Sequence, residues 1–251
     1  MEKGLDSYKL KMIALVFMIL DHIHTYLFHS QPRFISLITR FVAPLFLYLM
    51  IDGFYHTRNR LKFLIRLLVA GIIMQLGNTA INELFHHLDP QKYDFYLPWN
   101  NIFLTLASLF AFVWCLENVR QHNRKVLNIF LAFITAALSI FCEGGIYLLP
   151  VAFVVWLFHD KKHLQYVGII VWCIIILAFG LYNYYTSNSC DLYTYLCDFS
   201  QWAMFSLIPF IHLYNGKRGK NTASSKYLFY VVYPVHLWII LVLHLQFIVQ
   251  R

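Results

Sequence analysis

Ionisable side chains inside apolar segments are the residues of this chain that could carry chemistry. The first apolar segment contains Asp21, His22 and His24. Lys11 precedes His22 by eleven residues, so a helix places both side chains on one face, about 16 Å apart along its axis. Asp21 and His24 are three residues apart, and this spacing lets the carboxylate orient the imidazole ring. His22 is a candidate general base or nucleophile, and polar groups that only bridge helices are the alternative for both histidines.

Two further ionisable side chains are expected at the depth of His22. Arg40 lies about 9 Å inside the second apolar segment, and antiparallel packing of the first two segments would bring it close to Asp21. His236, with Tyr233 before it, lies about 15 Å inside the last segment. We therefore expect these groups to converge from three helices on one level. A purely structural ion pair between Arg40 and Asp21 is the alternative.

A basic stripe begins between the second and third apolar segments. Arg58, Lys62 and Arg66 are spaced by four residues, so a helix aligns them. Guanidinium groups bind phosphate oxygens in pairs, and the stripe could hold a polyphosphate at the inner membrane face. Topology charge and contacts with lipid headgroups are the alternative.

Amide side chains gather near the outer ends of the third and fourth apolar segments. Asn101 is the candidate among them for contact with an acceptor substrate, together with Tyr233 in the last segment. An amide side chain in this position more often forms a hydrogen bond between helices. The amides in question are Gln75, Asn78, Asn100 and Asn101.

The composition determines the kind of element that must position these side chains. Of 251 residues, 60% are hydrophobic and only 13% are charged, whereas a soluble domain has roughly a quarter charged residues. This excludes an ordinary soluble protein, a disordered chain and a nucleic-acid-binding module. His86 and His87 are too few ligands for a metal site, so we expect no metal. The fold class predicted is all-α, a polytopic membrane helix bundle in one domain, residues 1–251.

About nine transmembrane helices are predicted, because a span needs about 20 apolar residues. The sixth is the shortest and the weakest of them. The segments are Leu10–Leu27, Phe34–Phe54, Leu61–Ile81, Ile102–Glu117, Val126–Cys142, Gly145–Phe158, Leu164–Tyr184, Tyr195–Leu213 and Tyr227–Val249.

The distribution of basic residues predicts a cytoplasmic N-terminus. With that orientation, 16 of the 20 Lys and Arg lie inside and three lie outside, with Arg40 in a span, which agrees with the positive-inside rule. The outer loops hold acidic residues, Asp89 and Asp94 among them, and Cys190 and Cys197. The two cysteines could form a disulfide in an oxidising compartment or stay as free thiols.

Several stretches of the chain resemble the TraX-type pilin acetylase family of bacterial membrane proteins. The chain is more distantly similar to type-three membrane acyltransferases, in which a basic residue and a histidine eleven positions later belong to the first active-site helix, as Lys11 and His22 do here. The matches extend over nearly the whole length. The stretches are Lys11 to Ile23, Arg40 to Phe46, Asp52 to Asn59, Arg66 to Leu68, Asn101 to Thr105 and Phe229 to Leu237.

The resemblance implies transfer of an acyl group, usually acetyl, from cytoplasmic acyl-CoA to an extracytoplasmic acceptor across a bacterial cytoplasmic membrane. Lys11 and the basic stripe of Arg58, Lys62 and Arg66 would contact the coenzyme, which is a co-substrate. His22 would act as base or take the acyl group, and Arg40 or protonated His236 would stabilise the oxyanion. The expected partners are membrane lipids, acyl-CoA and the acceptor, with no nucleic acid.

Other functions are compatible with the same residues. The acceptor could be a glycan, a lipid-linked polymer or a pilin-like protein. A proton-coupled transporter or a lipid scramblase could use the interior groups as a proton relay, although the chain has no inverted repeat. A scaffold for envelope assembly is a third possibility.

Overall fold

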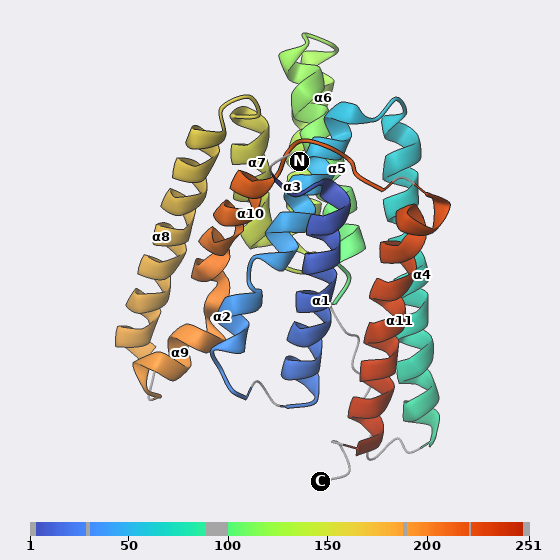
Figure 1. Ribbon diagram of the computed structural model, residues 1–251, viewed down its shortest axis with the longest axis vertical. Helices are drawn as coiled ribbons and strands as arrows, with labels where there is room; N and C mark the ends of the chain where they lie inside the picture. The colour runs from blue at the N-terminus through green and yellow to red at the C-terminus, as the bar shows by residue number, and fades with distance from the viewer. Residues whose placement is uncertain (1–3, 29–30, 89–99, 188–189, 221, 248–251) are drawn as a thin grey trace. The chain divides into compact units, whose positions relative to one another are not determined.

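The computed structural model describes residues 4–28, 31–88, 100–187, 190–220 and 222–247, and in them the chain is helical (Figure 1). An isolated bridge between Leu5 and Tyr214 is the β pairing in these residues. The elements are α1 (Ser7–Tyr26), α2 (Ile35–Thr39), α3 (Val42–His56), α4 (Arg60–Leu88), α5 (Ile102–Arg120), α6 (Lys125–Ile140), α7 (Gly145–Leu157), α8 (Lys162–Ser187), α9 (Leu192–Asp198), the 3-10 helix η1 (Ser200–Leu207), α10 (Ile208–Leu213) and α11 (Ala223–Phe247).

The helices form two compact units. The terminal unit comprises the described residues of 4–46 and 166–247, and the central unit comprises those of 47–88 and 100–165. The ionisable candidates of the first, second and last apolar segments all belong to the terminal unit. These are Lys11, Asp21, His22, His24, Arg40 and His236. The basic stripe and Asn101 belong to the central unit.

Five segments in the described part of the chain are long and apolar enough to cross a membrane, which makes this a membrane protein. The total of nine spans and the cytoplasmic N-terminus stay predictions. Two further apolar helices, α6 and α7, have 16 and 13 residues. The five segments are Ile35–His56, Arg60–Leu88, Ile102–Arg120, Lys162–Thr186 and Tyr227–Gln246.

The predicted eighth span, Tyr195–Leu213, is not one continuous α-helix. The chain there is divided into α9, η1 and α10. Phe199 ends α9 with a non-helical backbone (φ −86°, ψ 53°). Pro209 lies in the first turn of α10. Proline is tolerated there because the first N–H groups of a helix have no partner within it, but a proline cannot donate the hydrogen bond that would continue a helix from the preceding turn.

In the terminal unit, α1 packs against α11 and the two helices run in the same direction (Figure 1). Asp6 caps α1, because its side chain accepts a hydrogen bond from the backbone N–H of Lys9 at 2.8 Å. Successive contacts along the pair advance in parallel, from His22 with His236 to Tyr26 with His244. The polar residues of the first and last helices therefore meet at matching heights.

The central unit is built around α5, which packs against α4, α6 and α7. Gly71 of α4 lies directly against Leu104 of α5, and a Cβ atom at position 71 would overlap the Leu104 side chain. A larger residue at position 71 would require the Leu104 side chain to move. The close approach of α4 to α5 brings the Gly71 carbonyl within hydrogen-bond distance of the α5 N-terminus.

Candidate functional site

Two histidines from the first and last helices form the centre of the candidate site. His22 Nδ1 of α1 lies 2.9 Å from His236 Nε2 of α11. His236 Nδ1 lies 2.7 Å from the backbone carbonyl oxygen of Val232, one turn earlier in α11. The predicted convergence of His22 and His236 is confirmed.

The Val232 carbonyl determines which nitrogen carries each proton. A carbonyl oxygen only accepts, so His236 Nδ1 must donate its N–H to it. In neutral His236 the Nε2 atom is then a bare acceptor, and His22 Nδ1 must donate to it. This leaves the lone pair of neutral His22 on Nε2. The His22–His236 pair is thus ordered as a donor chain that ends on one basic nitrogen.

Aromatic rings from both helices surround the histidine pair. The Tyr233 ring lies edge-on to both histidine rings, with centroids 6.2 Å from His22 and 5.7 Å from His236. Tyr26, one turn after His22, lies 6.4 Å from it, and its backbone carbonyl accepts a hydrogen bond from His244 Nδ1 at 2.9 Å. Tyr26 and His244 were not among the predicted site residues. The sequence did contain a signal for them. Tyr26 lies one helical turn after His22, and His244 lies two turns after His236.

Asp21 and Arg40 come together as predicted, but with an additional partner. The distance from Arg40 Nη2 to Asp21 Oδ1 is 4.0 Å, and the hydroxyl of buried Thr39 donates a hydrogen bond to the same oxygen. Asp21 thus links α1 to the end of α2. Arg40 follows α2 directly and is held beside the helix that carries His22.

The predicted pairing of Asp21 with His24 is wrong. His24 is 1% exposed, and its Nε2 atom lies 2.9 Å from the backbone carbonyl oxygen of Pro32. The segment after α1 contacts this face of the helix, and its Pro32 carbonyl is the hydrogen-bond partner of His24. Asp21 instead faces Thr39 of α2. Sequence spacing brought the two residues to neighbouring positions of one helix, but the contacts with other segments determine their partners.

Lys11 lies on the same side of α1 as His22, as the spacing predicted. Its ammonium group is 5.9 Å from the centre of the Phe229 ring of α11, and His22 contacts α11 seven residues farther along that helix. The α1–α11 contact line therefore leads from Lys11 to the histidine pair.

The basic stripe lies on α4 and the turn before it. Arg58 and Lys62 are exposed, whereas the Arg66 guanidinium lies 5.5 Å from the Phe63 ring, and Arg66 Nε donates to the Lys62 carbonyl at 3.2 Å. Neighbouring Arg60 stacks on the buried Phe54 ring at 4.1 Å. The predicted helical alignment holds for Lys62 and Arg66 but not for Arg58, which lies before the first residue of α4. Part of the positive charge also packs on aromatic rings, because Arg66 lies against Phe63 and Arg60 against Phe54.

The side chain of Asn101 is engaged at both ends by the protein. Its oxygen accepts from the Leu104 N–H and caps α5, and its amide donates to the Gly71 carbonyl at 2.9 Å. At 4% exposure, it links α4 to α5. The contact with Gly71 is the hydrogen bond between helices that was the alternative for this amide. Contact of Asn101 with a substrate stays a prediction.

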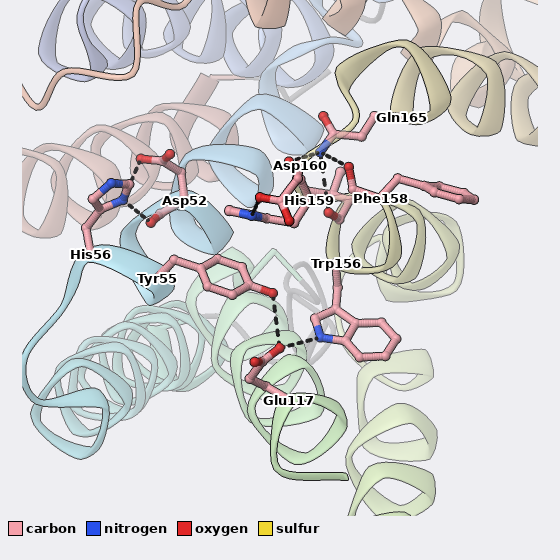
Figure 2. Close-up of polar contacts among 10 residues, drawn as sticks. Asp52, Tyr55, His56, Glu117, Trp156, Phe158, His159, Asp160 and Gln165 are labelled. Carbon is pink, nitrogen blue, oxygen red and sulfur yellow. Dashed lines mark hydrogen bonds and ion pairs between the residues drawn. The ribbon is translucent and has the colours of Figure 1, made fainter. Parts of the chain in front are cut away.

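A buried carboxylate in the central unit was missed by sequence reasoning. Glu117, near the end of α5, accepts hydrogen bonds from the Tyr55 hydroxyl at 3.3 Å, the Trp156 indole at 3.1 Å and the Gln121 amide at 2.9 Å. Figure 2 shows Tyr55 and Trp156 pointing at this carboxylate from two sides, with His159 above Tyr55. A Glu at the end of an apolar segment was the available signal. With three neutral donors, Glu117 ties the ends of α3, α5 and α7 together.

The described residues offer no group of three or more side chains that could hold a metal ion. The five cysteines are free thiols, with Cys190 exposed and Cys197 buried, so the structure shows no disulfide between them. The predicted loop residues Asp89 and Asp94 lie outside the described residues.

Comparisons with known proteins give a family and a named relative. A family model described as "TraX protein" matches residues 7–244, a range that includes the histidine pair and Arg40. The chain is also 30% identical over 248 residues to the "Probable fimbrial assembly protein FimC, serogroup H1" of Dichelobacter nodosus, covering 94% of this chain and 96% of that relative. No solved structure matches.

Proposed function

Since this chain belongs to the TraX family, we propose that it is a membrane acyltransferase that modifies an extracytoplasmic pilin-like protein with an acyl group from cytoplasmic acyl-CoA. The observation that carries the proposal is the ordered pair of His22 and His236. The similarity to a protein named for fimbrial assembly favours a pilin-like acceptor over a glycan or a lipid-linked polymer. The bacterial cytoplasmic membrane is the proposed location, with the chain crossing it several times.

His22 is proposed as the general base. Its Nε2 lone pair takes the proton of an acceptor amine or hydroxyl while that group attacks the thioester carbonyl. Collapse of the tetrahedral intermediate breaks the C–S bond, and the CoA thiolate takes the proton from His22 Nε2. The acyl group ends on the acceptor and His22 returns to its starting form.

His236 is proposed as the residue that orients this base, not as a cationic oxyanion stabiliser. Its Nε2 accepts the His22 Nδ1 proton, and its own N–H is committed to the Val232 carbonyl. This arrangement resembles the orienting partner in other base-catalysed transfers, where the partner holds the imidazole tautomer in place. Tyr233 packs against both rings and would limit their rotation.

Arg40 is the proposed stabiliser of the negative oxygen that develops in the transition state. The guanidinium group stays charged at any physiological pH and has five N–H donors. Its 4.0 Å approach to Asp21 anchors it next to the helix position that precedes His22. Such a donor in a water-poor site is worth roughly a hundredfold to a thousandfold in rate.

The test uses purified protein in lipid nanodiscs, radiolabelled acetyl-CoA and purified pilin, with the acetylated residue located by mass spectrometry. We expect His22→Ala to lower the transfer rate by about a hundredfold to ten-thousandfold. His24→Ala is the matched control, because it removes the other imidazole of α1, which bonds the Pro32 carbonyl. Size-exclusion elution shows whether each variant is folded.

A larger loss with His24→Ala than with His22→Ala would contradict the proposed base. No cleavage of acetyl-CoA by the wild type with any acceptor would reject the acyltransferase altogether. In that case the proton-coupled transporter would be tested by proton flux in sealed proteoliposomes, and this flux should then depend on His22.

A further inference from the structure

A cationic surface lies at the end of the terminal unit where α1 begins, and the proposed chemistry does not use it. It is formed by the first residues of α1 and by the loop between α10 and α11, which passes the start of α1 in Figure 1. Described residues 4–11 and 213–220 carry five cations and one carboxylate, Asp6. The cations, which we call the α10–α11 cationic surface, are Lys9, Lys11, Lys217, Arg218 and Lys220.

Hydrogen bonds fix this loop against the N-terminal segment. The Leu5 N–H donates to the Leu213 carbonyl at 2.8 Å, and the Asn215 N–H donates back to the Leu5 carbonyl at 3.0 Å. The Ser7 N–H donates to the Lys217 carbonyl at 2.8 Å. The loop therefore has a set position, and less conformational entropy is lost when its side chains bind a ligand.

Gly219 shows how closely the loop approaches α1. Its φ is +72°, a left-handed value that favours glycine. A Cβ atom at this position would overlap the Asp6 side chain. Asp6 caps α1 through the Lys9 N–H and also lies 3.9 Å from the Lys9 ammonium group, so the surface's one described carboxylate pairs with one of its five cations.

The surface continues along the α1–α11 contact line to the histidine pair. The Lys220 ammonium lies 5.9 Å from the Tyr8 ring, and Lys11 lies 5.9 Å from the Phe229 ring one turn farther along. From Ser7 to His22 the helix rises about 22 Å. An extended pantetheine arm with its thioester spans a distance of this order.

We propose that the α10–α11 cationic surface binds the phosphate groups of acyl-CoA, so that the thioester reaches His22 along the α1–α11 contact line. This inference rests on the proposed function. It places the phosphate contacts in the same unit as the histidine pair. The basic stripe of Arg58, Lys62 and Arg66, by contrast, lies in the central unit, where Arg66 packs on Phe63.

The experiment measures radiolabelled CoA binding to the full chain in nanodiscs of zwitterionic lipid, which supplies no anionic headgroups. R218E/K220E reverses two exposed charges of the surface. K161E/K162E, at the start of α8, reverses two other exposed lysines and is the matched control. We expect R218E/K220E to weaken CoA binding by about tenfold to a hundredfold, and the control to bind as the wild type does.

A second measurement separates phosphate contacts from folding. Acetyl-pantetheine carries the same thioester without the nucleotide phosphates. R218E/K220E should raise the KM for acetyl-CoA and leave the KM for acetyl-pantetheine unchanged, which a misfolded protein would not do. Added salt should weaken wild-type CoA binding, because exposed charges are screened.

Several results would overturn the inference. The inference is wrong if R218E/K220E binds CoA as tightly as the wild type does. It is also wrong if R58E/K62E/R66E loses CoA binding while R218E/K220E keeps it. Absence of CoA binding by the wild type, together with loss of retained phosphatidylglycerol in R218E/K220E, would identify a surface for lipid headgroups instead. CoA binding that depends on Arg218 and Lys220 without any acyl transfer would support the phosphate site and reject the proposed transferase.

Discussion

The orienting role of His236 predicts that its acceptor atom matters more than its ring. His236→Ala removes the acceptor of the His22 Nδ1 proton, whereas a glutamine at 236 can present its amide oxygen near the position of Nε2. We therefore expect His236→Ala to be strongly impaired and His236→Gln to be mildly impaired. Both variants leave His22 itself in place.

The expected size follows from the lost hydrogen bond. His236 is 9% exposed, and leaving a buried donor without a partner costs about 1–3 kcal/mol. If His22 must meet that cost to keep its basic nitrogen on Nε2, kcat falls by about fivefold to a hundred-and-fiftyfold in His236→Ala. With a glutamine acceptor, the loss should stay within about fivefold.

The assay is the rate of pilin acetylation at saturating acetyl-CoA, with the same nanodisc preparation for each variant. The double variant His22→Ala/His236→Ala supplies a further check. Residues that act as one unit are not additive, so the double variant should be no slower than His22→Ala alone. Thermal unfolding of each variant shows whether the native fold is retained.

Equal losses in His236→Gln and His236→Ala would refute the reasoning, because the ring itself would then be required, as a proton donor or as a cation. Unchanged kcat in His236→Ala would refute it in the opposite direction, since His22 would not need the partner. An additive loss in the double variant would mean that the two histidines act separately.

Three other expectations follow from the remaining polar contacts. Asn101→Ala should lower the free energy of unfolding in detergent by about 1–3 kcal/mol, because it removes the α5 cap and a buried donor, and an unchanged unfolding curve would contradict this. Glu117→Gln should destabilise by about 1–3 kcal/mol in the same measurement, since the added NH₂ group faces donors such as the Trp156 indole, whereas Glu117→Asp should be milder. The Thr194 backbone N–H lowers the pKa of the Asp191 carboxyl below its ordinary value. The α9 cap should therefore stabilise the fold above the pKa that Asp191 has in the unfolded chain, and this contribution should be lost as pH falls through the lowered pKa of the folded state. Asp191→Asn should remove this pH dependence of unfolding.

The helix face of the candidate site, and the shared level of its residues along the helices, could be predicted from the amino-acid sequence. Helical geometry fixes the rise and rotation per residue, so the spacing of Lys11 and His22 placed them on one side of α1. Counting inward from the segment ends placed His236 and Arg40 at the level of His22 and Asp21. The contacts at 2.9 Å and 4.0 Å agree with that arithmetic. The low charge content likewise predicted membrane-spanning helices.

The partners of these side chains depended on contacts between distant segments. The Thr39 hydroxyl of α2 donates a hydrogen bond to Asp21, and the Pro32 carbonyl, in the segment before α2, is the hydrogen-bond partner of His24. Both contacts arise because the chain after α1 returns against that helix. Local spacing on α1 contains no information about the path of this loop. The same applies to Glu117, whose donors come from α3, α5 and α7.

The tautomer of the histidine pair also required the tertiary structure. The sequence shows which residues carry imidazole rings, but a ring nitrogen becomes a donor or an acceptor through the atom that faces it. Here the deciding atom is the Val232 carbonyl oxygen, together with the rotation of α11 that turns His236 Nε2 toward His22. The sequence determined that basic side chains lie at one level of the membrane helices, and helix packing determined which nitrogen is left to accept a proton.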